Sequence, residues 1–250
     1  MALRTDLVGG SLVISAPVDV RLHETVPGTH ILLAQRLVAA PRSLRVGGPV
    51  PGLGRRLARA LAVVDRAWPR AGEEIRERTW MVVPLVEPGT VSYSHLSRPG
   101  ISYINVFRGS LLHLCDDLLH ETAHHRLHAR QEVERFLRDD GDALYYSPWR
   151  RTLRPLNGIL HGTYTFLYRA ELFLRILRKR QAVAGKQRRR LLREAGRELA
   201  NCSTALTDLA RADREGLLTP EGGTLVRGMR RRHALLRKGR LSAPGLFSIL

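Results

Sequence analysis

The sequence is poor in cysteine and has no long apolar run. Its 250 residues include 2 cysteines, Cys115 and Cys202, which are too few for a disulfide-stabilised scaffold, so a reducing cytoplasm is the default compartment. No segment approaches the roughly 18 apolar residues that span a bilayer. The N-terminal residues lack the basic start, long apolar core and cleavage site of an export signal. We therefore expect a cytoplasmic protein without a membrane-spanning segment.

Lysine and aromatic residues are also scarce. Of the 41 Lys and Arg residues only 3 are lysine, and with 23 Asp and Glu the formal net charge is +18. Residues 175–250 carry 19 basic and 6 acidic side chains, a net +13. This charge marks either a solvated helical face or a binding surface, for example one that attracts an acidic peptide. Between Lys179 and Leu246 there is no Phe, Trp or Tyr to stack on bases, so we do not expect nucleic-acid binding.

The spacing of apolar residues predicts an α+β fold that is predominantly α-helical. Pro and Gly interrupt the first fifty residues, which permits only short elements there. Beyond them we expect a helix, two strands that are neighbours in a small β-sheet, and two long helices: residues 55–68, 80–86, 101–107, 111–137 and 158–177. For residues 143–157 we expect an ordered loop. Residues 1–180 would form a catalytic metal-binding domain, and residues 181–250 a basic helical extension packed on it.

The pentapeptide His120-Glu121-Thr122-Ala123-His124 lies within the long helix expected after the sheet. Residues at i and i+4 share one face of a helix, so the two imidazoles can converge on one metal ion. Glu121 points beside that ion, where a carboxylate can orient or deprotonate bound water as the catalytic residue. The longer HExxHxxGxxH pattern of one metalloprotease class is excluded by Leu127 and Arg130. The alternative is a polar, histidine-rich helix face.

The third metal ligand should come from elsewhere in the chain. His113 and His128 share a broad helix face with the motif histidines, but ligands at i, i+4 and i+8 are nearly collinear and cannot surround an ion. His125 points away from the pair, to the surface or a supporting position.

His161 is the first choice for the third ligand, because it begins the next helix beside two glycines. Glu171 on the same helix is the alternative and would complete a set of two histidines and one carboxylate. Without a metal, His161 would be a packing residue at the helix start, and Glu171 a partner for Arg175 at i+4.

Three arginines lie between the motif and His161. Arg150, Arg151 and Arg154 are bracketed by prolines and offer a fork for the carboxylate of an organic acid. The alternative is ordinary salt bridging, for example to Asp139, Asp140 or Asp142.

Together these segments resemble a known family. The stretches SYSHLSRPGISYINVF, LLHETAHHRLH and YYSPWRRTLRPLNGILHGTYTF, with their spacing over residues 78–180, are similar to the HExxH-motif 2-oxoglutarate-dependent peptide β-hydroxylases of ribosomal peptide (RiPP) biosynthesis. The resemblance implies a non-haem Fe(II) dioxygenase that uses 2-oxoglutarate and O2 to hydroxylate the β-carbon of a residue in a precursor peptide. It places His120 and His124 as ligands, Glu121 as the motif glutamate, and Arg150 and Arg154 in the arginine block. His161 falls in the second motif.

Two enzymatic interpretations follow. In the first, Fe(II) is chelated by 2-oxoglutarate whose distal carboxylate is anchored on the arginine block, and the substrate is a precursor peptide with an acidic leader. In the alternative, Zn(II) occupies the same histidines and the protein is a metallopeptidase. A homodimer would be formed through apolar pairs in the C-terminal region: Leu191-Leu192, Leu235-Leu236 and residues 246–250.

Overall fold

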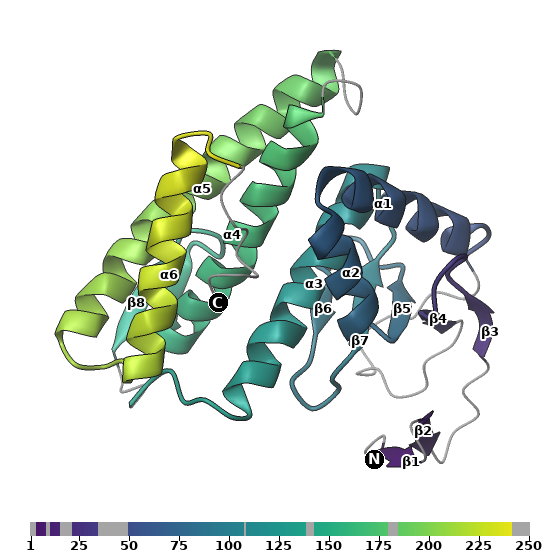
Figure 1. The fold of residues 1–250 in the computed structure, drawn as a ribbon, viewed down its shortest axis with the longest axis horizontal. Helices are drawn as coiled ribbons and strands as arrows, with labels where there is room; N and C mark the ends of the chain where they lie inside the picture. Colours follow the sequence, from purple (N-terminus) through teal and green to yellow (C-terminus); the bar gives the residue numbers. More distant parts are fainter. Residues whose placement is uncertain are drawn as a thin grey trace. The chain divides into compact units, whose positions relative to one another are not determined.

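The computed structural model describes residues 4–8, 11–15, 22–34, 50–107, 109–138, 143–179 and 185–241. These residues form six helices and nine strands (Figure 1). The chain divides into two compact units, the first made of Met1–Ala62 with Glu74–Thr122 and the second of Val63–Glu73 with Ala123–Leu250. The prediction of a predominantly helical α+β fold is confirmed.

The first unit contains a five-stranded sheet in the order β3-β4-β5-β7-β6. Its strands are β3 (Leu22–Thr25), β4 (Leu32–Ala34), β5 (Met81–Leu85), β6 (Tyr93–Ser94) and β7 (Ile101–Asn105). The two predicted strands, β5 and β7, are confirmed as parallel neighbours with Met81 opposite Ile101. All five β5 residues are buried, as expected for a central strand. A separate hairpin joins β1 (Arg4–Val8) to β2 (Ser11–Ser15).

Two helices precede β5. Helix α1 spans Leu53–Ala67, close to its predicted range, and Pro69 begins a second helix, α2 (Pro69–Arg78), which the sequence did not predict. Proline at a first helical position loses no hydrogen bond, because that N–H has no partner within the helix. The proline therefore both ends one helix and starts the next.

Helix α3 spans Leu111–Gln131 and carries the HExxH sequence. It ends earlier than the predicted residue 137, since backbone turns follow at Glu132 and Val133. The loop predicted at residues 143–157 is wrong: it is a hairpin of β8 (Leu144–Ser147) and β9 (Thr152–Pro155). In β8 exposed and buried residues alternate, which is the period of a half-buried strand.

Three helices follow the hairpin in the second unit: α4 (Leu156–Arg178), α5 (Gly185–Arg214) and α6 (Pro220–Arg237). They run side by side in Figure 1, and both α5 and α6 pack on α4. The basic helices are therefore part of the same unit as α4, and the division of the chain falls within α3, not near residue 180. The physical reason is that α4 buries side chains around most of its circumference and needs neighbours on several sides.

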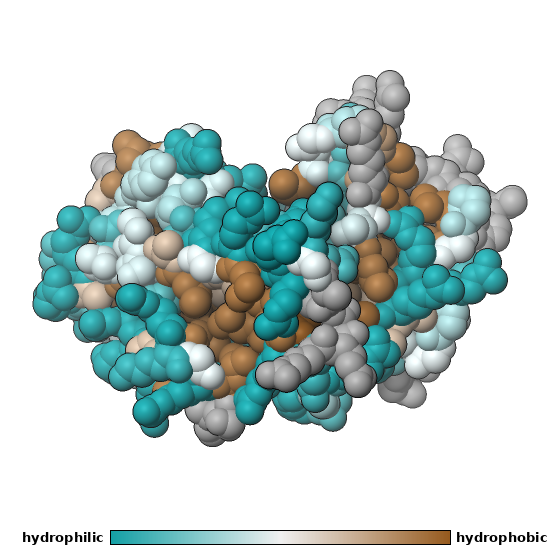
Figure 2. All heavy atoms as spheres, turned by 90° about the horizontal axis from the view of Figure 1, so that it is seen from above, coloured by the Kyte–Doolittle hydropathy of each residue, from teal (hydrophilic) through white to brown (hydrophobic). Residues whose placement is uncertain are grey.

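The apolar pairs proposed for a dimer contact are partly used inside the second unit. Leu191 and Leu236 are buried, whereas Leu192 is exposed and Leu235 half-buried. Residues 246–250 lie outside the described residues. Hydrophilic side chains cover much of the face shown in Figure 2, with hydrophobic residues in smaller patches between them. No helix among the described residues is long and apolar enough to cross a membrane.

Candidate metal centre

Three histidines of the second unit converge on one point. His124 and His128 extend from α3 and His161 from α4, and each offers a ring nitrogen that lies within 4.8 Å of the other two. The ring centroids are 5.9 Å apart for His124–His128, 5.8 Å for His124–His161 and 5.2 Å for His128–His161. Ligands about 2.05 Å from a tetrahedral ion are about 3.3 Å apart, so the three nitrogens would have to move closer together to hold one ion.

The geometry of this histidine cluster follows from helix periodicity. His124 and His128 are one helical turn apart and share a face of α3, while His161 approaches from a second helix. The three donors are therefore not collinear as three histidines on one helix would be, because two come from α3 and the third from α4. His120, predicted as a ligand, is not part of this cluster and belongs to the first unit. The structure thus groups His124 with His161, as expected, but adds His128 in place of His120.

A chain of amide hydrogen bonds holds His161. Gln131, the last residue of α3, receives the His161 Nε2 hydrogen on Oε1 at 2.9 Å, and its own Nε2 donates to Asn157 Oδ1 at 3.2 Å. Since an amide oxygen only accepts, His161 keeps its lone pair on Nδ1, the form that a metal requires. Burial, helped by nearby His128, lowers the pKa of His161 to about 4 and keeps the ring neutral. Gln131 and Asn157 were not singled out from the sequence.

Glu171, the alternative third ligand, is not in the histidine cluster. It lies ten residues after His161 on α4, about 15 Å further along the helix axis. Its carboxylate is fully buried and accepts from Arg175 Nε at 2.8 Å on Oε1, from Arg232 Nε at 2.8 Å on Oε2, and from Arg232 Nη2 on Oε1. The prediction of an Arg175 partner at i+4 is confirmed, and Glu171 is an ion-pair residue.

Glu121 is buried in the first unit with 1% of its surface exposed. Burial raises its pKa to about 8, and the nearby Asp117 and Asp116 carboxylates raise it further, against a lowering by the Ser94 hydroxyl. No hydrogen bond of ordinary geometry joins Glu121 to Ser94, and Glu121 Oε2 has no partner among the described residues. Burial therefore favours the protonated form of the motif glutamate. His125 is also buried, so the surface position considered for it is wrong.

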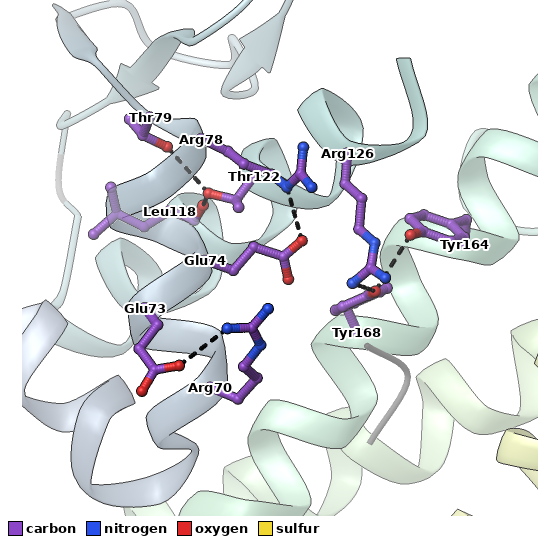
Figure 3. Close-up of polar contacts among 10 residues, drawn as sticks. All are labelled: Arg70, Glu73, Glu74, Arg78, Thr79, Leu118, Thr122, Arg126, Tyr164 and Tyr168. Atoms are coloured by element: carbon purple, nitrogen blue, oxygen red, sulfur yellow. Dashed lines mark hydrogen bonds and ion pairs between the residues drawn. The ribbon is translucent and has the colours of Figure 1, made fainter. Parts of the chain in front are cut away.

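Polar contacts hold the middle of α3 to neighbouring residues (Figure 3). In the first unit, Thr122 donates to the Leu118 carbonyl at 2.7 Å and lies 3.1 Å from the Thr79 hydroxyl. In the second unit, Arg126 donates to the Tyr168 hydroxyl on α4 at 3.2 Å. The latter contact ties the segment that carries His124 and His128 to the helix that carries His161.

The hairpin is fastened to α4 through Trp149. Its ring stacks on Phe166 at 4.7 Å, and its Nε1 donates to Glu198 Oε2 on α5 at 2.9 Å. A Cβ atom at Gly162 would lie only 3.0 Å from the Trp149 ring, so glycine is needed beside His161 to let the tryptophan approach. The segments 147–149 and 161–162 therefore pack against each other.

The three candidate anchor arginines are exposed, and none has an ion-pair partner among the described residues. Arg151 sits in the hairpin turn with φ 55°. The Arg154 side chain passes over Gly158. A Cβ atom at Gly158 would lie 3.5 Å from Arg154 Cβ and 3.7 Å from Arg154 Nε. Gly158 is one helical turn before His161, so Arg154 is the arginine that the structure holds nearest to the start of α4. The alternative partners, Asp139, Asp140 and Asp142, lie outside the described residues.

Sequence reasoning passed over His128 as a ligand, although the His-x-x-x-His spacing that marks the motif recurs at residues 124–128. The pairs His120–His124 and His124–His128 have equal spacing, so the position of α4 is needed to decide which pair meets a third ligand. The chain matches no known protein-family model, and no curated protein is significantly similar to it.

Proposed function

We propose that this chain is a metal-dependent oxygenase, an Fe(II)- and 2-oxoglutarate-dependent peptide β-hydroxylase, with its metal on His124, His128 and His161. The observation that carries the proposal is the convergence of these three ring nitrogens within 4.8 Å from two helices. The family resemblance of the surrounding sequence supports the choice of iron, 2-oxoglutarate and O2.

The donor set fits a divalent transition metal. Neutral imidazoles bind Fe(II) and Zn(II) well, and three of them on one side of an ion leave positions open for other ligands. Within the described residues the cluster contains no carboxylate. Bound iron with 2-oxoglutarate supplies the oxygen chemistry, in which a peptide C–H, O2 and 2-oxoglutarate give the alcohol, succinate and CO2.

The chain's own residues supply binding and orientation. Gln131 fixes the His161 ring through the 2.9 Å hydrogen bond to Nε2, which would leave the lone pair of Nδ1 available to a metal. Arg154 is the proposed anchor for the distal carboxylate of 2-oxoglutarate, because an arginine remains charged and matches a carboxylate with two parallel donors. Arg150 and Arg151 extend the same positive surface along the hairpin.

The outer face of the hairpin offers a surface for a peptide. Leu144, Tyr146 and Leu153 are 54%, 48% and 60% exposed, and Tyr146 lies directly opposite Leu153 across the two strands. Large apolar side chains exposed together are typical of interaction sites. We propose that the substrate peptide binds along this face.

The zinc metallopeptidase is the alternative that the test must separate. Its usual mechanism needs a glutamate directly after the first ligand histidine, and in the cluster that position is His125. This favours the hydroxylase over the peptidase.

The test begins with metal analysis of protein purified without oxygen, followed by Fe(II) titration of the metal-free protein. We expect one Fe(II) per chain, with binding lost in His128→Ala and retained in His120→Ala, the matched control one helical turn outside the cluster. Iron-loaded protein with 2-oxoglutarate and O2 should then release succinate and add one oxygen atom to an acidic-leader peptide. Stoichiometric zinc with peptide fragments and no succinate would establish the peptidase instead, and equal binding by the two variants would refute the ligand set.

A further inference from the structure

A second polar site lies away from the histidine cluster, between α5 and α6 in the second unit. It is a groove of about 330 Å³ whose lining is mostly polar. Its lining residues are Ser203, Leu206, Thr207, Ala210, Arg214, Arg230 and His233. No acidic residue is among them, although both helices carry acidic side chains elsewhere.

The two groove arginines differ from their neighbours on the same helices. Arg211 pairs with Asp208 at 3.2 Å and Glu215 at 3.9 Å, and Arg227 pairs with Asp213 at 3.6 Å. Arg214 and Arg230 have no such partner among the described residues, and both are exposed. Two cations that line one groove without a counter-charge repel each other, and an anion between them removes that cost.

Two of the polar groups in the groove already donate their hydrogens to backbone carbonyls. The His233 Nε2 hydrogen is used by the Leu199 carbonyl at 2.8 Å, and the Thr207 hydroxyl donates to the Ser203 carbonyl at 3.0 Å. The Ser203 hydroxyl has no partner among the described residues, so it joins the two guanidinium groups as a free donor. A free hydroxyl donor beside two guanidinium groups without an acidic partner favours an oxyanion.

Carboxylates are the oxyanion that the groove fits best. Its volume of about 330 Å³ exceeds that of a single small anion. Neither Gly185–Arg214 nor Pro220–Arg237 contains a Phe, Trp or Tyr on which a nucleic-acid base could stack. Arginine forks match carboxylate geometry. We infer that the α5–α6 groove is a docking site for an acidic peptide segment, which in the proposed hydroxylase is the segment that recruits the substrate.

The inference rests on the proposed function only for the origin of the peptide, so binding is measured without turnover. The probe is a fluorescein-labelled peptide of ten residues that alternates Glu and Ala, followed by anisotropy with the full chain. The double variant Arg214→Glu, Arg230→Glu should weaken binding at least about tenfold, as expected for two lost charge-assisted contacts. The matched control is Arg189→Glu, Arg193→Glu, which changes the net charge equally at exposed positions of α5 outside the groove.

The control should weaken binding by less than about threefold, in line with screened charges at a distance. Equal losses in the two double variants would overturn the inference, because they would show attraction by net charge alone. Equally tight binding of a single-stranded oligonucleotide or of inorganic phosphate, lost in the groove variant, would also overturn the assignment to peptide carboxylates. Thermal unfolding by circular dichroism confirms that both variants fold. His128→Ala should bind the peptide normally, which separates failure of this site from failure of the metal centre.

Discussion

The buried ion pair between α4 and α6 offers a stability test of the second unit. Both Glu171 and Arg232 are 0% exposed, and the carboxylate faces two guanidinium groups at once. Among the described residues, Arg232 Nη1 has no hydrogen-bond partner, and Glu171 is the acidic partner of this guanidinium group. Glu171→Gln preserves the shape of the side chain but removes its charge. Leaving a buried charge unpaired costs about 3–5 kcal/mol, and we expect the free energy of unfolding to fall by that amount.

The assay is urea unfolding followed by circular dichroism, with hydrogen exchange of the α6 amides to locate the loss. The control is Glu194→Gln, which breaks an ion pair with Arg190 that is 53% exposed on the arginine side. Exposed pairs contribute less than about 1 kcal/mol, so this variant should unfold almost as the parent does. Replacing both Glu171 and Arg232 by Met should recover most of the loss, since no buried charge of that pair remains. If Glu171→Gln lowers the free energy of unfolding no more than Glu194→Gln does, the buried ion pair does not stabilise the second unit as we expect.

Three further predictions concern the neighbourhood of the histidine cluster. Gln131→Leu should weaken Fe(II) binding by about 10- to 100-fold in a competition titration, because the His161 ring loses its orienting partner; unchanged affinity would remove Gln131 from the site. Gly162→Ala should destabilise the protein by about 1–3 kcal/mol in urea unfolding, because its Cβ meets a Trp149 ring held on two sides. Gly196→Ala, with nothing within 4 Å, should instead stabilise it by about 0.5–1 kcal/mol, and equal effects of the two changes would contradict the packing. Arg154→Gln should raise the 2-oxoglutarate concentration for half-maximal succinate release at least about tenfold, and a parent-like value would disprove the anchor.

The comparison of the two glycines shows why composition alone does not assign a role. Both lie inside helices, where glycine is usually unfavourable relative to alanine. Only the neighbourhood separates them, since one faces an indole ring and the other faces open space. The same holds for the arginines of α5 and α6, some of which are paired with acids while Arg214 and Arg230 have no acidic partner within the described part of the chain.

The sequence by itself determined the local features of this protein. Helical periodicity predicted α1, α3 and α4, the apolar runs predicted β5 and β7 as neighbours, and the spacing of histidines predicted that pairs of them share a face of α3. These features depend on residues a few positions apart, whose relative placement is fixed by the repeat of the helix or strand. The hairpin was missed because prolines and arginines obscured its short alternation.

Only the tertiary structure decided which groups meet across elements. The pairs His120–His124 and His124–His128 have the same spacing. The position of α4 beside the second half of α3 brings His161 close to His124 and His128. Glu171 was a plausible ligand from the sequence, but the fold places Arg232 of α6, 61 residues later in the chain, against it. Packing between distant segments determines which polar side chains meet. The burial of apolar helix faces fixes how the helices lie together, and the polar side chains are placed by that arrangement.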